Sequence, residues 1–381
     1  MRFVHLSDLH LGKRVCQFSM LEDQKYIISQ IFKIISKSSI DAVLIAGDVY
    51  DKAVPSVEAV KLFNDFIVEL THIGVKVFII SGNHDSAERL SVYSTLIEAS
   101  GVYISPAYNG ELFCKALDDE FGKINIYMLP FIKPISVRNY FTENRMEDAN
   151  DMMKCVIDSA NVNSQERNII LSHQFVTGSK TSESEELSIG GLDNVDADVF
   201  DAFDYVALGH IHKPQRILRD TLRYCGTPLK YSFSEVNNNN SLVIIDMKEK
   251  GNIQLEFVPL KPVRDMRIIK GSYDEVTLKA NYENTNTDDY VKIILTDEDD
   301  IPNAMARLRA IYPNVMQLEY DNKRTNSGAD IIESQNVQDK TEAELFSELF
   351  EFQNGQKMSD KQLDYISQII ERARVESDET D

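Results

Sequence analysis

The sequence predicts an α/β protein whose strands are joined by helical crossover connections. One observation is a set of short apolar runs, rich in β-branched residues, which are typical of buried strands. They cover residues 2–6, 42–46, 76–80, 169–171 and 205–208. The other is that residues 21–37 and 56–72 repeat apolar residues at intervals of three and four, as amphipathic helices do. Strands that alternate with helices in this way indicate an α/β sheet with crossovers.

The pattern changes near residue 237. The run from Asn237 to Asn240 predicts a turn, and we expect a hairpin there. Residues 241–247 and 253–260 are the strands expected to pair beside it. Two prolines, Pro259 and Pro262, then interrupt the chain, and we place a domain boundary between them.

We expect four parts along the chain. They are a main domain at 1–261, a small strand-helix-strand-helix-strand domain at 262–322, a polar linker at 323–340, and a C-terminal region at 341–381. Two amphipathic helices are predicted in the last part, at 341–352 and 359–374. The second helix carries an apolar face formed by Leu363, Ile366, Ile369 and Ile370. Such a face is suited to a groove on a partner. Periodicity alone supports packing of this face on the chain's own domain nearly as well.

The net charge of −21 weighs against a protein that holds DNA by its own surface alone, because phosphate contacts need Lys and Arg. The acidity is uneven, however. Residues 281–381 carry 23 acidic and 10 basic side chains, against 38 and 30 in residues 1–280. The excess therefore lies mainly in the last quarter of the chain.

The cysteines and the apolar runs predict a cytoplasmic location. The four cysteines are Cys16, Cys114, Cys155 and Cys225. They are far apart and form no Cys-x-x-Cys pair, so the sequence favours reduced thiols over a zinc knuckle or a disulfide scaffold. No signal peptide is visible. No apolar run approaches the roughly 20 residues that a membrane helix needs.

Five polar fragments follow the ends of apolar runs. They are Asp8-Leu9-His10, Gly47-Asp48, Gly82-Asn83-His84-Asp85, Ser172-His173 and Gly209-His210-Ile211-His212. Ligands bind at the carboxyl ends of strands in α/β sheets. Residues two apart share a face of a strand, so Asp8 and His10 should reach one ion, as should His210 and His212. Five of the seven histidines lie in these fragments, which predicts a single site.

The donor types predict two divalent ions. Carboxylate, imidazole and amide donors without thiolate suit manganese, iron, zinc or magnesium. The seven donor residues are Asp8, His10, Asp48, Asn83, His173, His210 and His212. They are too many for one ion of ordinary coordination, but they suffice for two ions that share a carboxylate. Such ion pairs serve phosphoryl displacement.

Each fragment has an ordinary structural reading when it stands alone. Gly47-Asp48 and Gly82-Asn83 are common turn dipeptides, and His173 alone could be a hydrogen-bonded core histidine. Only Gly209 to His212 favours a metal site by itself. We assign His5 to packing and His72 to the surface, and we expect Asp51 to cap a helix or to lie behind the ligands.

The order Asp-x-His, Gly-Asp, Gly-Asn-His, a lone His and Gly-His-x-His resembles the calcineurin-like metallophosphoesterases over residues 1–245. The resemblance implies a four-layer α/β/β/α sandwich with two metals between its sheets. It gives one ion Asp8, His10, Asp48 and His212, and the other Asp48, Asn83, His173 and His210. It also implies that His84 is catalytic, stabilising or protonating the leaving oxygen, with Asp85 or another carboxylate orienting it.

Further stretches resemble the SbcD family of nuclease subunits, which belong to bacterial SbcCD complexes: residues 82–90, 209–215, 223–235 and 345–362. This resemblance implies a manganese-dependent nuclease, with magnesium as the alternative. The implied activities are exonuclease on DNA duplex ends and endonuclease on single strands and hairpins, in DNA repair, recombination and replication. The implied partner is an SbcC-like coiled-coil ATPase bound by residues 341–381, with a homodimer of this chain inside a heterotetramer. Residues 262–322 would form a capping domain.

Two other functions are open to the same motifs. One is a phosphomonoesterase or nucleotidase, against which we weigh the chain beyond residue 262, since a minimal phosphatase does not need it. The other is a metal-free scaffold, which usually lacks several ligands, whereas all seven positions are filled here.

Overall fold

The computed structural model describes residues 1–141, 146, 148–182, 185, 194–322, 342–354, 357–359, 361–366 and 369–370. It contains two compact units. The first comprises residues 1–295 and 301–319, and the second comprises residues 296–300 and 320–381. Each unit is described by itself.

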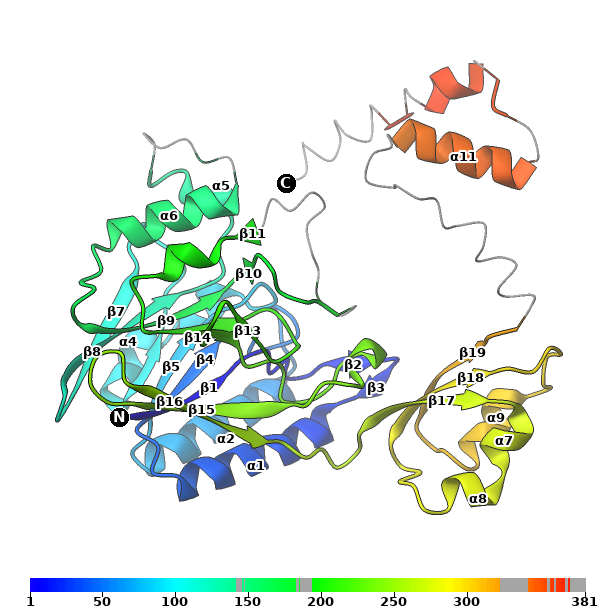
Figure 1. Ribbon diagram of the computed structural model, residues 1–381, viewed down its shortest axis with the longest axis horizontal. Helices are drawn as coiled ribbons and strands as arrows, with labels where there is room; N and C mark the ends of the chain where they lie inside the picture. Colours follow the sequence, from blue (N-terminus) through cyan, green and yellow to red (C-terminus); the bar gives the residue numbers. More distant parts are fainter. Residues whose placement is uncertain are drawn as a thin grey trace. The chain divides into compact units, whose positions relative to one another are not determined.

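Two six-stranded sheets form the centre of the first unit (Figure 1). The order in the first sheet is β16 (Ile253–Pro259), β15 (Ser241–Met247), β1 (Arg2–Leu6), β4 (Ala42–Ala46), β5 (Lys76–Ile80) and β6 (Val102–Ile104). The order in the second is β13 (Gln215–Ile217), β14 (Arg219–Tyr224), β12 (Tyr205–Gly209), β9 (Arg167–His173), β8 (Gly122–Leu129) and β7 (Phe113–Asp119). In each sheet the central strands run parallel, β1 with β4 and β5, and β8 with β9 and β12.

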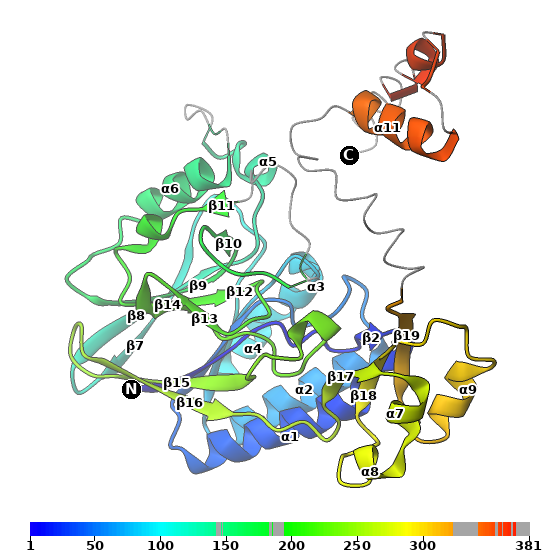
Figure 2. The ribbon, with the colours of Figure 1, turned by 45° about the vertical axis from the view of Figure 1, so that its right-hand side comes forward.

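The four layers predicted by the family resemblance are present. Apolar side chains of both sheets, among them Phe78 and Ile169, form one buried cluster between the sheets. Helices α1 (Leu21–Lys37) and α2 (Val57–His72) cover the outer face of the first sheet, and α6 (Ala149–Ser159) covers that of the second (Figure 2). The predicted strands and the two long helices of the first half all occur within a residue or two of their expected bounds.

Smaller elements complete this unit. They are β2 (Arg14–Val15), β3 (Phe18–Ser19), α3 (Ala87–Ser91), α4 (Ser94–Ile97), η1 (Glu98–Ser100), α5 (Pro134–Val137), β10 (Phe175–Val176), β11 (Asn194–Val195), η2 (Ala197–Phe200) and η3 (Phe233–Glu235).

The hairpin predicted at the asparagine run is wrong in its position. Strands β15 and β16 do pair antiparallel, but residues 248–252 join them, where Gly251 has a φ of 78°. The asparagine run instead precedes β15. Asn240 is buried there, and its Nδ2 donates to the carbonyl oxygen of Thr227 at 2.7 Å. A glycine that reaches the left-handed region makes the tight turn that the asparagines were expected to make.

Residues 266–320 form a small arrangement of strand, two short helices, strand, helix and strand, which has one helix more than the strand-helix-strand-helix-strand order that the sequence predicts. Its sheet has the order β17 (Met266–Gly271), β18 (Tyr290–Leu295) and β19 (Val315–Tyr320), with α7 (Tyr273–Thr277), α8 (Lys279–Tyr282) and α9 (Ala304–Arg309). Arg264 donates to the buried carboxylate of Asp23 on α1 at 2.6 and 3.0 Å, and the Tyr290 hydroxyl donates to it at 2.8 Å. The domain boundary at residue 261 stays a prediction.

The second unit contains α11 (Glu342–Asn354) and a helical stretch at 361–366. The whole of the predicted linker and the end of the second predicted helix lie outside the described residues. Across the part of the chain that the structure describes, no helix combines the length and the apolar character needed to cross a bilayer.

Candidate metal centre

The structure brings all seven predicted ligands together at the carboxyl ends of five strands. Asp8 and His10 follow β1, Asp48 follows β4 and Asn83 follows β5. His173 is the last residue of β9, and His210 and His212 follow β12. All except Asn83, which is partly exposed, are buried. Polar side chains are seldom buried together without partners or a ligand, so this cluster is the candidate site.

The backbone that presents the ligands is strained. Asp8, His10, Asp48 and His210 have φ values of 52°, 44°, 49° and 97°, in the left-handed region that L-residues rarely adopt. Residues are held in this region mainly at functional sites. Strand alternation therefore does not explain how Asp8 and His10 converge, because β1 ends at Leu6.

Two glycines leave room that a side chain would fill. A Cβ at Gly82 would lie 2.1 Å from Oδ1 of Asp48, and a Cβ at Gly209 would lie 1.9 Å from the carbonyl oxygen of Ala46. Gly209 thus lets the two sheets approach closely at the site, and Gly82 leaves room for the Asp48 carboxylate beside the neighbouring strand of the same sheet.

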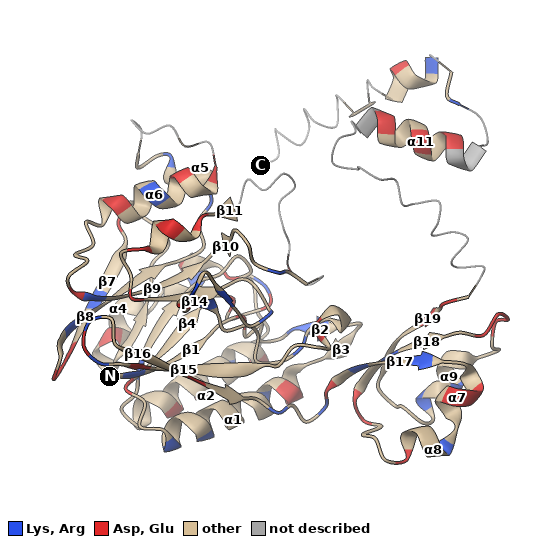
Figure 3. Ribbon diagram, viewed as in Figure 1, with Lys and Arg blue, Asp and Glu red and all other residues tan. Residues whose placement is uncertain are grey.

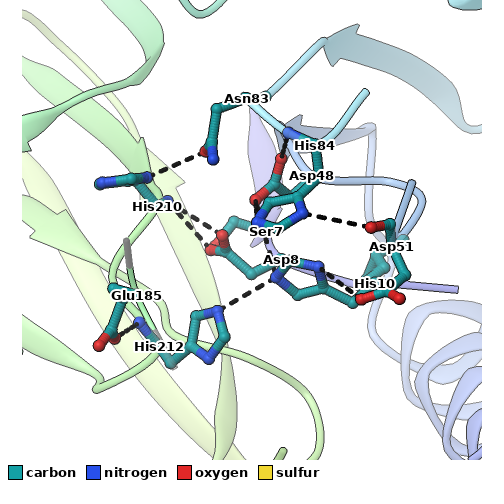
Figure 4. A network of polar contacts seen from close by, with 12 residues as sticks. Ser7, Asp8, His10, Asp48, Asp51, Asn83, His84, Glu185, His210 and His212 are labelled. Carbon is teal, nitrogen blue, oxygen red and sulfur yellow. Dashed lines mark hydrogen bonds and ion pairs between the residues drawn. The ribbon is translucent and has the colours of Figure 1, made fainter. Parts of the chain in front are cut away.

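One group of donors gathers around His10. Its Nε2 lies 3.1 Å from Nε2 of His212 and 3.6 Å from Oδ2 of Asp48 (Figure 4). Asp8, His10 and His212 can each offer one ligand atom to a common point. These residues match one ion's predicted ligand set.

A second group gathers around Asn83. Its Oδ1 lies 3.0 Å from Nε2 of His173 and 3.1 Å from Nδ1 of His210, and Nε2 of His173 lies 3.4 Å from Oδ2 of Asp48. His210 therefore turns toward Asn83, whereas His212 turns toward His10 (Figure 4). The prediction that these two histidines reach one ion together is wrong, because the φ of 97° at His210 breaks the strand alternation.

Facing acceptor atoms indicate that the cluster fits cations. Nδ1 of His173 lies 2.8 Å from the carbonyl oxygen of Ala46, and Nδ1 of His212 lies 2.9 Å from Oε1 of Glu235. Both neighbours accept hydrogen bonds, so each Nδ1 carries a proton, and Nε2 is the ring atom of each that is turned toward the site. The raised pKa of His173 places a proton on its Nε2, facing the Asn83 oxygen, and a bound cation would take the place of that proton. Donor atoms about 3 Å apart suit ions with ligand distances of about 2.0–2.2 Å.

The charges of the cluster keep Asp48 ionised. Burial by itself would raise the pKa of Asp48, but the imidazoles of His173 and His10 outweigh burial and hold the pKa below its ordinary value. Burial lowers the pKa of His173, yet the carboxylate of Asp48 outweighs that effect and raises it to about 9. Burial lowers the pKa of His210 to about 3, so this ring is neutral and can act as a ligand.

His84 lies at the open side of the site. Its side chain is 26% exposed, and its Nε2 is 4.0 Å from Oδ2 of Asp48. Its Nδ1 lies 3.2 Å from the backbone oxygen of Asp51. Of the two expected alternatives for orienting His84, Asp85 is excluded, because it accepts three backbone N–H groups instead, those of Val49, Tyr50 and Gly82. The carboxylate near the ring is that of Asp48.

Other polar residues surround the cluster. Asp51 caps no helix, since Ser56 caps α2, and it lies behind the ligands, with Oδ1 3.9 Å from Nδ1 of His10. Ser7, which the motifs did not single out, donates to Oδ2 of Asp8. Glu235 was also missed, although it ends one of the stretches that resembled the SbcD family.

Two family models and a curated relative match most of the chain. Residues 1–214 match the family model described as calcineurin-like phosphoesterase, and residues 262–354 match one described as type 5 capsule protein repressor C-terminal domain. The chain is 34% identical over 382 residues to the SbcD subunit of the nuclease SbcCD from Staphylococcus epidermidis, and the alignment covers 98% of this chain and 100% of that protein. A dimetal phosphatase from Danio rerio, a solved structure, gives a TM-score of 0.44 at 12% identity, covering 69% of this chain and 98% of that one.

Proposed function

The chain belongs to the calcineurin-like phosphoesterases and, among them, to the SbcD family of nuclease subunits, and we propose that it hydrolyses DNA phosphodiester bonds with a pair of divalent ions. The observation that carries the proposal is the convergence of seven oxygen and nitrogen donors from five strand ends, whose facing oxygen and nitrogen atoms lie 3.0–3.6 Å apart. The substrate is supported by the full-length relation to a nuclease subunit.

The proposed ligand sets follow the two groups around the shared carboxylate of Asp48. One ion is held by Asp8, His10, Asp48 and His212, and the other by Asp48, Asn83, His173 and His210. We propose manganese, with magnesium as the alternative, because the donors are carboxylates, imidazoles and one amide, without thiolate. Bound divalent ions stabilise the charge that develops on a phosphodiester and supply a nucleophile at neutral pH.

His84 is the proposed catalytic side chain. It is supported by its place at the exposed side of the cluster, where a phosphodiester can approach it. Its Nδ1 faces the backbone oxygen of Asp51, which leaves Nε2 turned toward the site. From that position it stabilises or protonates the leaving oxygen of the cut strand. The proposed reactions are exonuclease cleavage of duplex ends and endonuclease cleavage of single strands and hairpins.

The proposed partner is an SbcC-like coiled-coil ATPase that binds ATP for the complex. The sequence has no Gly-x-x-x-x-Gly-Lys-Ser/Thr motif of its own. The C-terminal helices are the proposed docking elements. On α11, Phe346 and Leu349 are exposed, and acidic side chains alternate with them (Figure 3). Exposed apolar side chains on a helix suit a groove on another protein.

A second copy of this chain is the proposed partner at the face formed by α2, α3 and α4. That face holds an apolar groove of about 610 Å³. Exposed apolar side chains line it: Val54, Val60, Val68, Val92 and Tyr93. The exposed Val57 and Leu96 lie on the same helices, α2 and α4. Apolar patches of this kind mark association sites, and two copies related by a twofold axis would bury the same patch on each other. A parent chain that is a monomer by light scattering would contradict the dimer, and Leu96→Asp should convert a dimer to a monomer.

One assay decides between the proposed nuclease and its alternatives. The purified chain with Mn²⁺ is given a phosphodiester dye, a phosphomonoester dye and a DNA hairpin, and its metal content is measured. We expect diester and hairpin cleavage, with about two ions per chain. Preference for the monoester would establish the phosphatase instead. Less than about one ion per chain after loading would favour a metal-free scaffold.

A further inference from the structure

The connection between the two sheets wraps around the metal centre. We call residues 226–235, which lie between β14 and β15, the strap. The backbone N–H of Thr227 donates to the carbonyl oxygen of His212 at 3.1 Å. The hydroxyl of Tyr231 donates to the carbonyl oxygen of Leu9 at 2.6 Å, between the two proposed ligands that follow β1. The strap thus holds the backbone at two ligand-bearing loops without supplying a ligand.

The last residue of the strap reaches a ligand side chain. Glu235 is fully buried. Its Oε1 lies 2.9 Å from Nδ1 of His212, and its Oε2 accepts the backbone N–H of Tyr231 at 2.9 Å. An ionised carboxylate only accepts hydrogen bonds, so in the neutral, metal-binding form of the His212 ring the proton sits on Nδ1. The lone pair of Nε2 then faces Nε2 of His10, 3.1 Å away.

The two proposed ion sites differ in what stands behind their histidines. Nδ1 of His173 faces a neutral backbone carbonyl, that of Ala46, at 2.8 Å, whereas Nδ1 of His212 faces the carboxylate of Glu235. A carboxylate partner fixes the ring and raises its basicity as a ligand, and loss of such a partner typically costs 10–100-fold in metal affinity. The site that contains His212 is therefore the one that depends on a buried charge outside its ligands.

We propose that Glu235 is a positioning residue that fixes the tautomer and orientation of His212, and thereby sets the affinity of the ion held by Asp8, His10, Asp48 and His212. The inference rests on the proposed two-metal function. It assigns a role to the last residue of the 223–235 stretch. It also predicts that the binding of one of the two ions can be weakened while the binding of the other is unchanged.

A purely structural role for Glu235 makes a different prediction. The carboxylate also accepts the Tyr231 N–H, so its loss would destabilise the strap in any case. Glu235→Gln separates the two roles by charge. His212 and Tyr231 face different oxygens of Glu235, and the amide replaces one of these two oxygens by an NH₂ group that cannot accept, so only one of the two hydrogen bonds keeps its acceptor in place. The matched control is Asp23→Asn, which neutralises another buried carboxylate, one that accepts from Arg264 and Tyr290.

The test is calorimetric titration of the full metal-depleted chain with Mn²⁺, beside thermal unfolding of the metal-free proteins. We expect the parent and Asp23→Asn to bind Mn²⁺ at two sites with the same affinities. In Glu235→Gln we expect the Mn²⁺ affinity of one site to fall by about 10–100-fold and that of the other site to stay unchanged.

Three results would overturn the inference. Parent affinity at both sites in Glu235→Gln, with a loss of thermal stability like that of Asp23→Asn, would make Glu235 structural only. A parent that binds no Mn²⁺ would overturn the proposed function together with the inference. If Glu235→Gln does not fold, Glu235→Asp decides, because it keeps the charge but withdraws it by one methylene. Unchanged affinity at both sites in that variant would equally exclude the positioning role.

Discussion

Gly82→Ala places a methyl group against the carboxylate that the two ions are proposed to share. The new Cβ would lie 2.1 Å from Oδ1 of Asp48 and 2.4 Å from its backbone nitrogen. Ordinary contact requires the carboxylate or the loop to move by about 1 Å, and a displacement of about 1 Å at a catalytic centre can cost roughly 100-fold in rate. Overpacking a buried site also costs about 1–3 kcal/mol of stability.

The assay is diester hydrolysis with Mn²⁺ beside urea unfolding of the same samples. Gly271→Ala is the matched control, since its nearest neighbour is the end of the flexible Glu275 side chain, at 3.2 Å. We expect Gly82→Ala to lose about 100-fold in activity while it stays folded, and Gly271→Ala to keep parent activity. If Gly82→Ala cleaves the diester within about threefold of the parent, the geometry inferred around Asp48 is wrong.

Three further predictions concern single side chains. Asp48→Ala should abolish diester cleavage and lower the metal content, because it removes a donor from both proposed ions; retained activity with two ions per chain would exclude the bridge. His84→Ala should leave the metal content near that of the parent and slow cleavage by about 10²–10⁴-fold, and parent-like cleavage would exclude its catalytic role. Asp119→Asn should cost about 3 kcal/mol at pH 7, because Arg167 is left buried without its anion. Burial would raise the pKa of Asp119, but hydrogen bonds from Arg167 hold it well below its ordinary value of 3.8. This stability is therefore fully present above about pH 3.8 and is lost only as the pH falls further. A difference in unfolding free energy from the parent that shrinks between pH 7 and pH 5 would contradict this sign.

The sequence indicated which residues meet at the site, but it suggested the wrong reason for their convergence. Polar residues at successive strand ends predicted one cluster, because the carboxyl ends of parallel strands share an edge. Strand alternation was expected to turn Asp8 and His10 toward one ion, and His210 and His212 likewise toward one ion. Left-handed backbone at Asp8, His10 and His210 decides their directions instead, and periodicity carries no information about single residues in that region.

Residues behind the ligands could not be recognised from local sequence. Glu235 is 23 positions from His212, and Tyr231 is 222 positions from Leu9. Their contacts form only when the strap crosses between the sheets. Asp85 shows the opposite: it is adjacent to His84 in the sequence, and it was an expected partner for that ring, but it does not make the contact. The fold directs it instead to three backbone N–H groups at the ends of β4 and β5.

The sequence alone determined the class of the fold, the layered arrangement through its family resemblance, and the set of donors that can hold metal. These depend on residue type and short-range spacing, which hydrophobic periodicity and motif order report directly. Only the tertiary structure decided how the donors divide into two groups, what stands behind each histidine, and which face of the first unit is left apolar. These depend on contacts between residues far apart in the chain, whose geometry is fixed by the packing of one sheet on the other.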